Sequence, residues 1–561
     1  MILIFRFENQ ANMEDVPKTP TNIMSEDDLA ILSDPLTDEF ATPELFFGLV
    51  GAIGTDLNNL QRILEKTLRL EVGYVSKSRK LTDIFSSTQE TDCYERYLAK
   101  MNDGTALRNK YKRADAAILK ALSGVRAHRR SDNSNLTFST EEDSSELPLD
   151  RAAFIFNSLK RPEEVETLRR VYGRSFYLIG AYSARDARVT ALAERIAESR
   201  NRQTSEEFRP YAEALIEKDR ADQGVKLGQA VQKTFPEADV FVSLDDEEKA
   251  EKEIHRFIRL IFGDAFFTPS RYEQAMFLAK ASALRSADLG RQVGAVIIDK
   301  EGAVLAVGTN EVPKAKGGQY WEGDNPDKRD FKYKCDSNFK MKKRLIGEIS
   351  DQLATVLECG LKQMSEKIGN ADYSIGEIDT LIKTIIAEAK LDEHIEKSQL
   401  SNLIAYFRAV HAEMSALSEA ARRGVSIQDA ELVCTTFPCH ECARHIIAAG
   451  ISKVVFIEPY PKSLTTELYS DSIVVDNPKA KDSFVHFVPF VGVAPRQFMT
   501  LFDASQIERK NNGELLEWSS QTSKPRTSDS PQAYIFKERK RLAFIEASDR
   551  QLQTTGSKSN D

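Results

Sequence analysis

The sequence has few of the features that mark secreted or membrane proteins. It contains six cysteines in 561 residues, too few for a disulfide framework. No apolar run approaches the roughly 20 residues that a bilayer-spanning helix needs. The opening MILIFRF is too short for a signal peptide and has no basic start. We therefore expect a cytoplasmic protein without a membrane segment.

An excess of positive charge is also lacking. The 77 Lys and Arg residues are outnumbered by 86 Asp and Glu residues, which gives a net charge of −9. This balance disfavours general electrostatic attraction to nucleic acid or anionic lipid, although a local basic groove is compatible with it. Hydrophobic residues make up 41% and charged residues 29%, as in folded globular proteins. Small-molecule chemistry is the better starting interpretation.

The length predicts several domains, since one domain takes about 150 residues. Residues 8–42 are rich in Asp, Glu, Asn, Pro and Thr without apolar periodicity, which predicts a mobile leader over 1–42. Polar composition also predicts a tail over 506–561. Between them we expect two domains, over 43–250 and 253–505.

The first of these domains has the pattern of a parallel α/β sheet. A short apolar run at 45–54 ends in glycines and precedes a helical pattern at 55–70. Strands are predicted at 152–159 and 175–183, with a helix at 161–173 between them. The polar stretch 126–148 has no periodicity and is interpreted as a solvated loop.

The second domain is predicted to follow the order α-β-β-α-β-α-β. The predicted segments are a helix at 270–286, a hairpin at 292–310, a helix at 411–424, a strand at 431–437, a helix at 438–450 and a strand at 453–460. An insertion over 314–408 interrupts this order, with helical patterns at 343–364 and 378–390.

Two helix starts in the second domain carry the residues for metal chemistry. His411 precedes one helix, and Cys439 and Cys442 open the next, just after Pro438. Two cysteines at i and i+3 in a first turn face one ion, and a helix N-terminus favours their thiolate form. Together with the imidazole they form three ligands for Zn²⁺ and leave a fourth position open to water, which is the arrangement of catalytic sites.

Glu413 is the candidate general acid and base, because it lies two residues after the predicted histidine ligand. The H-x-E and P-C-x-x-C signatures together are typical of zinc deaminases of nucleobases. The alternatives are a structural zinc site, with His440 or His445 as fourth ligand, or simple buried thiols. The remaining cysteines are interpreted as ordinary packed or surface thiols, namely Cys93, Cys335, Cys359 and Cys434.

The segments RQVGAVIID, GTNEVP, HAEMSAL and TTFPCHECARHII resemble the deoxycytidylate deaminase branch of the cytidine deaminase superfamily. The likeness covers roughly 265–310 and 405–465 and implies a three-layer α/β/α fold with catalytic zinc. It also implies that Asn310 contacts the substrate and that Arg285 and Ser286 lie near its phosphate. The plainer alternatives for these three are an ordinary turn residue and a solvated helix end.

A glycine-rich segment after the first predicted strand resembles a phosphate-binding loop. Its candidate nucleotide-binding residues are Gly48, Gly51, Gly54, Thr55 and Asp56. The loop lacks the lysine of G-x-x-x-x-G-K-[ST], which makes phosphoryl transfer doubtful. Nucleotide binding and a tight strand-to-helix turn both remain open.

Further segments extend the resemblance to most of the chain. NSLKRPEEVETLRRVYGRSFYLIGAYS and DRADQGVKLGQAVQKTFPEADVFV are similar to P-loop kinase-like segments fused to such deaminases, and EPYPKSL and FVPFVGVAPRQF agree. The chain thus resembles the two-domain antiphage deoxycytidine nucleotide deaminases of bacteria. That resemblance implies conversion of dCTP or dCMP to deoxyuridine nucleotides, which depletes dCTP during phage infection. It further implies a homo-oligomer, a regulatory nucleotide at the P-loop and, in some members, an inhibitory small RNA.

Three other functions stay open on the sequence. One is a housekeeping dCMP deaminase that supplies dUMP for thymidylate synthesis, with the first domain as an allosteric module. Another is a polynucleotide-editing deaminase, which would need a basic channel that the net charge of −9 disfavours. The last is a nucleotide-dependent switch whose zinc is only structural.

Overall fold

The structure is a computed structural model, and it describes residues 42–85, 90–133, 144–222, 224–368, 384, 406–460, 463–477, 480–481, 483–505, 507–526 and 530–557. From Pro43 onward the chain forms one compact unit. The expected leader lies outside the described residues except for residue 42.

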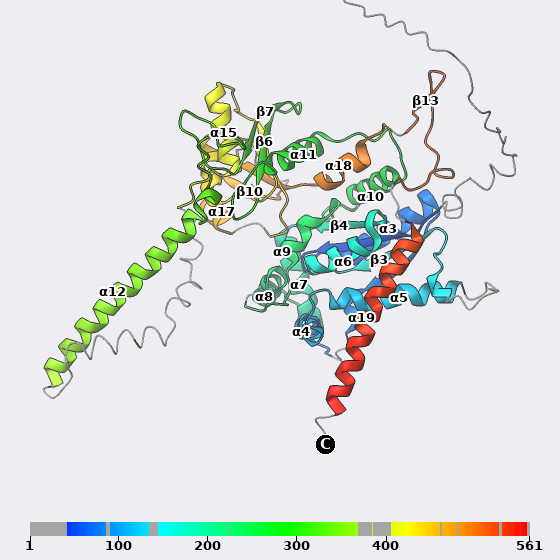
Figure 1. Cartoon of the computed structure of the whole chain (residues 1–561), viewed down its shortest axis with the longest axis horizontal. Helices are drawn as coiled ribbons and strands as arrows, with labels where there is room; N and C mark the ends of the chain where they lie inside the picture. Colours follow the sequence, from blue (N-terminus) through cyan, green and yellow to red (C-terminus); the bar gives the residue numbers. More distant parts are fainter. Residues whose placement is uncertain are drawn as a thin grey trace, which may run out of the picture. The chain divides into compact units, whose positions relative to one another are not determined.

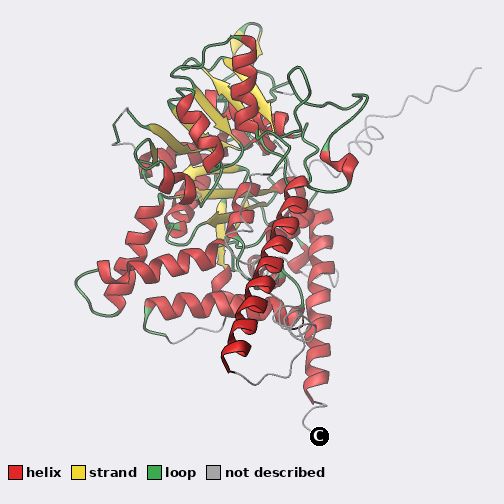
Figure 2. Cartoon of the chain, turned by 90° about the vertical axis from the view of Figure 1, so that its left-hand side faces the viewer, coloured by secondary structure: helices red, strands yellow, loops and turns green. Residues whose placement is uncertain are grey.

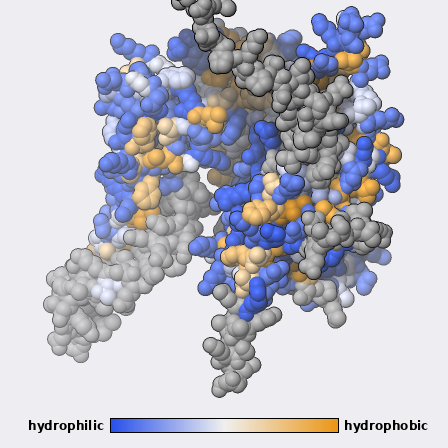
Figure 3. Space-filling model, turned by 45° about the vertical axis from the view of Figure 1, so that its right-hand side comes forward, coloured by the Kyte–Doolittle hydropathy of each residue, from blue (hydrophilic) through white to orange (hydrophobic). Residues whose placement is uncertain are grey.

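None of the helices in the described part is both long enough and apolar enough to cross a bilayer. On the face drawn in Figure 3, most residues are hydrophilic and the apolar ones form separate patches.

The first six-stranded sheet has the order β12-β5-β4-β1-β3-β2 (Figure 1). Its parallel strands are β1 (Leu45–Gly51), β2 (Val75–Lys80), β3 (Ala152–Asn157), β4 (Phe176–Tyr182) and β5 (Val240–Ser243). Strands β1, β3 and β4 are buried along their whole length, as expected of central strands covered by helices on both faces. The parallel α/β sheet predicted from the sequence is confirmed.

Helices cover both faces of this sheet. In chain order these helices begin with α3 (Leu57–Val72), α4 (Cys93–Tyr111), α5 (Ala116–Asp132), α6 (Pro162–Tyr172) and α7 (Arg185–Ser199). They continue with α8 (Arg209–Arg220), α9 (Val231–Thr234) and α10 (Glu247–Ile261). Strand β2 was not predicted, because its sequence VSKSRK is polar and it lies at an exposed edge.

The interpretation of 126–148 as a solvated loop is wrong for its first residues, which form the end of α5. Arg129 there is fully buried, and its guanidinium pairs with Glu44 at 2.7 Å and with Glu538 at 2.6 Å. Two carboxylates therefore neutralise a charge that the local sequence alone places in water.

The second six-stranded sheet has the order β10-β11-β9-β8-β6-β7. Its strands are β6 (Gly294–Ile298), β7 (Val304–Thr309), β8 (Glu431–Cys434), β9 (Lys453–Phe456), β10 (Ile473–Val475) and β11 (Val485–Pro489). The helices are α11 (Arg271–Ala283), α15 (Ala412–Arg423), α16 (His440–Ala448) and α17 (Ser463–Leu468). The predicted order α-β-β-α-β-α-β is confirmed.

Alternate residues of the second sheet face different helices. Val296, Ile298 and Val433 join a core with α11, whereas Ala295 and Leu432 join a core with α15 and α16. The sheet is thus the middle of three layers. Glycine at 308 is required by this packing, because a Cβ there would lie 2.1 Å from the carbonyl oxygen of Ala412. The close approach sets the first turn of α15 directly against β7.

The insertion begins with helix α12 (Ser337–Ile368), which runs away from the second sheet (Figures 1 and 2). This helix contains the pattern predicted at 343–364. The pattern at 378–390 lies outside the described residues apart from residue 384.

The end of the chain returns to the first sheet. Strand β12 (Gly492–Val493) pairs antiparallel with β5, and α18 (Pro495–Phe502) follows. A small hairpin of β13 (Lys510–Asn511) and β14 (Glu514–Leu515) precedes α19 (Pro531–Ser557). Within the expected polar tail, α19 packs on α5 and buries Tyr534 and Glu538 completely.

Candidate metal centre and active site

Two helix N-termini bring three ligand side chains together. His411 is the N-cap residue of α15, and Cys439 is the N-cap residue of α16, with Cys442 in that helix's first turn. The predicted placement of all three at helix starts is confirmed. Helix α16 follows the carboxyl end of β8. The N-termini of α15 and α16, which carry the positive ends of their helix dipoles, meet at the three ligands.

The distances fit a shared metal ion. His411 Nδ1 lies 3.3 Å from Cys439 Sγ and 3.3 Å from Cys442 Sγ. A tetrahedral zinc, with Zn–S of about 2.3 Å and Zn–N of about 2.0 Å, places sulfur and nitrogen ligands about 3.5 Å apart. All three ligand atoms lie within 4.8 Å of one another, and no fourth residue joins them within the described chain. The donor set is that of an open zinc site.

A hydrogen bond from the Cys442 thiol lowers the pKa of the Cys439 thiol, and the neighbouring His411 lowers it further. A thiolate at a helix N-terminus is the form in which cysteine binds zinc.

Glu413 lies in the first turn of α15 and is only 3% exposed. Burial raises the pKa of its carboxyl group, and the adjacent charge of Cys439 raises it further. The fully buried thiol of Cys434 is also a close neighbour, since it interacts with Glu413. Cys434 is packed, as the sequence predicts, but its place beside Glu413 was not anticipated.

Aromatic rings support the two ligand-bearing segments. The ring of Phe407, near the end of the predicted insertion, meets the His411 ring edge-on at 6.0 Å between centroids. Phe437 precedes the cysteines and meets Phe456 of β9 edge-on at 4.8 Å. The sequence signal missed here is an aromatic residue a few positions before each ligand.

The side-chain amide of Asn310 forms hydrogen bonds with two backbone groups. Its Oδ1 accepts a hydrogen bond from Val293 N at 2.7 Å, and its Nδ2 donates to Arg291 O at 2.8 Å. The residue is 8% exposed. In this structure its amide fixes the segment before β6, and contact with a substrate stays a prediction.

Arg285 and Ser286 end the turn after α11. The guanidinium of Arg285 donates to Gln319 and to the carbonyl of Tyr320, and stacks on Trp321 with 3.7 Å from its carbon to the ring centroid. Arg285 lines a cavity of about 820 Å³, and none of the three metal ligands is among the residues that line this cavity. Ser286 is buried and accepts from Asp288 N. Their proximity to a substrate phosphate also stays a prediction.

The residues of the predicted phosphate-binding loop lie in two different places, one inside a strand and four in the wall of a cavity. Gly48 lies inside β1, where a Cβ would be 2.5 Å from Leu159, so its role there is packing. Gly51, Gly54, Thr55 and Asp56 line a cavity at the end of β1. Gly54 has φ +92°, a conformation that favours glycine.

Comparisons with known proteins agree with the geometry of the metal centre. Residues 269–458 match the family model described as cytidine and deoxycytidylate deaminase zinc-binding region. Deoxycytidylate deaminase of Enterobacteria phage T2 is 44% identical over 54 residues, 10% of this chain and 29% of the phage protein. ComE operon protein 2 of Bacillus subtilis (strain 168) is 42% identical over 53 residues, 9% of this chain and 28% of that protein. The chain thus spans less than a third of the length of these relatives.

Among solved structures, the dCMP deaminase of cyanophage S-TIM5 in complex with dCMP and dUMP is similar at 17% identity, with a TM-score of 0.20. The alignment covers 40% of this chain and all of the phage chain. By the match to that family model, residues 269–458 of this chain are similar to the zinc-binding region of cytidine and deoxycytidylate deaminases.

Proposed function

We propose that the chain is a zinc-dependent hydrolase that deaminates deoxycytidine nucleotides, dCMP or dCTP, to deoxyuridine nucleotides. The observation that carries the proposal is a three-ligand group, His411, Cys439 and Cys442, with the buried carboxyl of Glu413 beside it. A structural zinc site is disfavoured because such sites use four protein ligands.

The reaction adds water at C4 of the cytosine ring and releases the 4-amino group as ammonia, which leaves uracil. Zinc held by the three ligands would supply the electrophilic activation of the attacking water. Glu413 accepts the protons of that water and delivers one to ring N3 and the other to the departing amine, so that ammonia leaves and C4 becomes a carbonyl. A raised pKa suits this double role, since a general acid and base works best with a pKa near the working pH.

The experiment compares the wild type with Glu413→Ala, and with Glu419→Ala as the matched control, a partly exposed carboxylate on the same helix. Ammonia release from dCMP and dCTP is measured together with zinc content. We expect Glu413→Ala to lower turnover by a factor of about 10² or more while one zinc per chain remains bound. Unchanged deamination in Glu413→Ala, or no deamination by the wild type, would contradict the proposal.

The biological role we propose is depletion of dCTP during phage infection. Its support is the resemblance of most of the chain to two-domain antiphage deaminases. The alternative is housekeeping production of dUMP, which is equally compatible with a local match to a deoxycytidylate deaminase such as that of Enterobacteria phage T2. Nucleotide pools of cells that express the wild type or Glu413→Ala, measured with and without phage, separate the two roles. A fall in dCTP that depends on infection supports defence, and turnover confined to dCMP supports the housekeeping role.

Three further features belong to the same proposal: a homo-oligomeric assembly, a regulatory nucleotide at the first sheet and an inhibitory small RNA. Their support is the same resemblance. Mass measurement in solution tests the first, and deaminase assays with total RNA from the host test the last.

A further inference from the structure

A cavity of about 770 Å³ opens at the carboxyl edge of the first sheet. Three strands end in its wall, with Gly51 at the end of β1, Lys80 at the end of β2 and Asn157 at the end of β3. In open parallel sheets, ligands bind outside the carboxyl ends, where the chain passes from one side of the starting strand to the other. The order β5-β4-β1-β3-β2 places that point at β1, beside the cavity.

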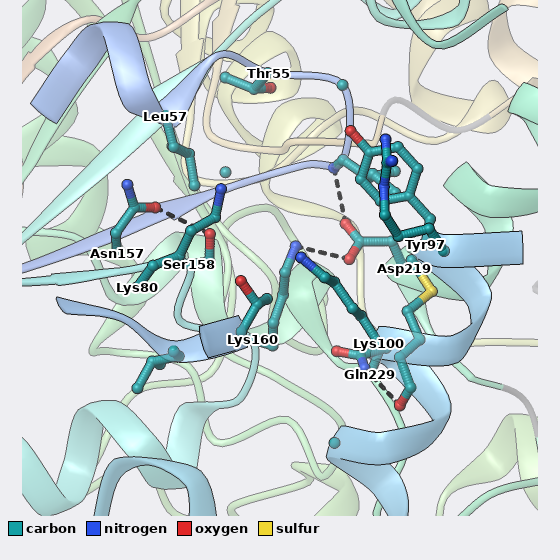
Figure 4. Close-up of a pocket in the computed structure, with 18 of the residues that line it drawn as sticks. Thr55, Leu57, Lys80, Tyr97, Lys100, Asn157, Ser158, Lys160, Asp219 and Gln229 are labelled. Carbon is teal, nitrogen blue, oxygen red and sulfur yellow. Dashed lines mark hydrogen bonds and ion pairs between the residues drawn. The ribbon is translucent and has the colours of Figure 1, made fainter. Parts of the chain in front are cut away.

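Positive charge converges on this cavity from three separate elements. Figure 4 shows the side chains of Lys80, Lys100 and Lys160 pointing into it, from β2, α4 and the segment after β3. Lys160 pairs with Asp219 at 2.8 Å. Within the described chain, Lys80 and Lys100 form no ion pair, so the cavity carries cations that its own carboxylates leave unbalanced.

Buried polar atoms in the wall are also left without partners. The hydroxyl of Thr55, Oε1 of Gln229 and Nε of Arg108 have no hydrogen-bond partner among the described residues. These residues are only 9%, 6% and 2% exposed. A buried polar atom without a partner destabilises the protein, so a polar ligand that reaches these atoms gains a hydrogen bond without breaking one.

The start of α3 does not supply the anion site that the sequence suggested. The carboxylate of Asp56 caps that helix and accepts hydrogen bonds from the N–H groups of Asn58 and Asn59, both at 3.1 Å. An anion in the cavity is therefore held by the lysines rather than by the helix end.

The cavity also has apolar side chains in its wall. Its lining includes Leu81, Phe85, Tyr97 and Met101, and the amide of Gln229 donates to the carbonyl of Met101 at 3.4 Å. A flat ring packs against such side chains, and an amide recognises the polar edge of a base. The volume lies in the range of small-molecule and cofactor sites.

We propose that this cavity is a second ligand site, which binds a nucleoside phosphate with its phosphates at Lys80, Lys100 and Lys160 and its base against the apolar side chains of the wall. None of the three metal ligands lines this cavity, so the site is separate from the proposed deaminase centre. This inference does not depend on the deamination proposed above, and it gives the regulatory nucleotide of the proposed function a place and a set of binding residues.

The experiment uses the full chain loaded with zinc and carrying Glu413→Ala, with dCMP present in excess to fill the deaminase centre. ATP, adenosine and inorganic tripolyphosphate are titrated by calorimetry. We expect one ATP per chain, competition by tripolyphosphate and at least about tenfold weaker binding of adenosine. A charge-assisted hydrogen bond to phosphate of about 1.5–3 kcal/mol corresponds to about 10–150-fold in Kd.

Two lysine variants, Lys80→Ala and Lys100→Ala, are each expected to weaken ATP binding about tenfold or more. The matched control is Lys252→Ala, an exposed lysine of α10 whose side chain is 71% exposed and which lies outside the cavity. Thr55→Val removes only the unpartnered hydroxyl. It is expected to weaken ATP binding without lowering the melting temperature, whereas a structural role predicts a lower one.

Several results would overturn the proposal. These are no binding of ATP or tripolyphosphate at millimolar concentration, adenosine binding as tight as ATP, or unchanged affinity in both lysine variants. One-to-one displacement of ATP by dCMP with the same constants in the lysine variants as in the parent protein would also overturn it, because ATP would then bind at the deaminase centre. If dCMP itself fails to bind, only the proposed deamination is in doubt, since ATP binding is measured independently.

Discussion

A buried hydrogen bond joins the cavity of the first sheet to the sheet that holds the metal centre. The hydroxyl of Tyr460 donates to Asp219 at 2.7 Å, and the same carboxylate oxygen accepts Ile53 N from the loop after β1 at 2.8 Å. Tyr460 lies four residues beyond β9, whose last residue, Phe456, packs against Phe437 just before the zinc cysteines. We predict that Tyr460→Phe uncouples ligand binding in the cavity from binding of dCMP.

The magnitude follows from the groups involved. Asp219 is fully buried and Tyr460 is 5% exposed, and burial raises the pKa of Tyr460 far above its ordinary value, so the phenol stays a donor. A hydrogen bond to a charged group contributes about 1.5–3 kcal/mol. If the two sites communicate through this bond, the coupling is at most of that size, a factor of about 10–150 in affinity.

The assay measures the Kd of dCMP with and without saturating ATP, and the Kd of ATP with and without saturating dCMP, in zinc-loaded Glu413→Ala protein. Linkage requires the two ratios to be equal. We expect a ratio clearly different from 1 that falls toward 1 when Tyr460→Phe is added. Tyr211→Phe, which removes a hydroxyl from an exposed position on the helix that carries Asp219, should leave the ratio unchanged. A ratio of 1 without Tyr460→Phe, or a full ratio retained with it, would refute this reasoning.

Two further predictions test the fold around the sites. Gly308→Ala places a Cβ 2.1 Å from the carbonyl oxygen of Ala412, the residue after the proposed zinc ligand His411. We therefore expect zinc content, measured by metal analysis, and deamination, measured by ammonia release, to fall together by about tenfold or more. Full zinc occupancy in this variant would contradict the packing argument. Asp476 is a carboxyl group whose pKa burial and a nearby carboxylate raise to about 6, so folding favours its protonated form, and its ionisation destabilises the protein as pH rises from about 4 to 6 and above. Asp476→Asn should raise the melting temperature at pH 7 to 8, equivalent to about 1–3 kcal/mol, with no gain near pH 4; Asn tolerates the positive φ of 50° there as well as Asp does. A gain that is independent of pH would contradict the assigned pKa.

The metal centre was the most predictable part of the molecule. Its ligands lie in two short motifs, and each motif coincides with the first residues of a helix that the apolar pattern also predicts. Helix starts are local features, because capping and periodicity act within a few residues. Only the meeting of the two motifs required the sheet, in which Cys434 of β8 pairs with Ala295 of β6 and with Phe456 of β9.

The cavity in the first sheet was only partly predictable. Glycines after a strand indicated the loop, but Lys100 and Lys160 lie 45 residues or more further along the chain, in segments without a motif. Strand β2 was hidden because an exposed edge strand does not need apolar residues. Its last residue, Lys80, becomes part of a site only because three strands end at the same edge.

The sequence by itself therefore determined the parallel α/β pattern of the first sheet, the order of elements around the metal centre and the residues able to hold zinc. Tertiary structure alone decided the return of the chain end to the first sheet, where Glu538 of α19 meets Arg129 across 409 positions. It also decided the contact of Tyr460 with Asp219, which are 241 residues apart. The physical reason is range: periodicity and capping act over a few residues, whereas a buried charge or hydroxyl is stabilised by whichever distant partner the completed fold brings to it.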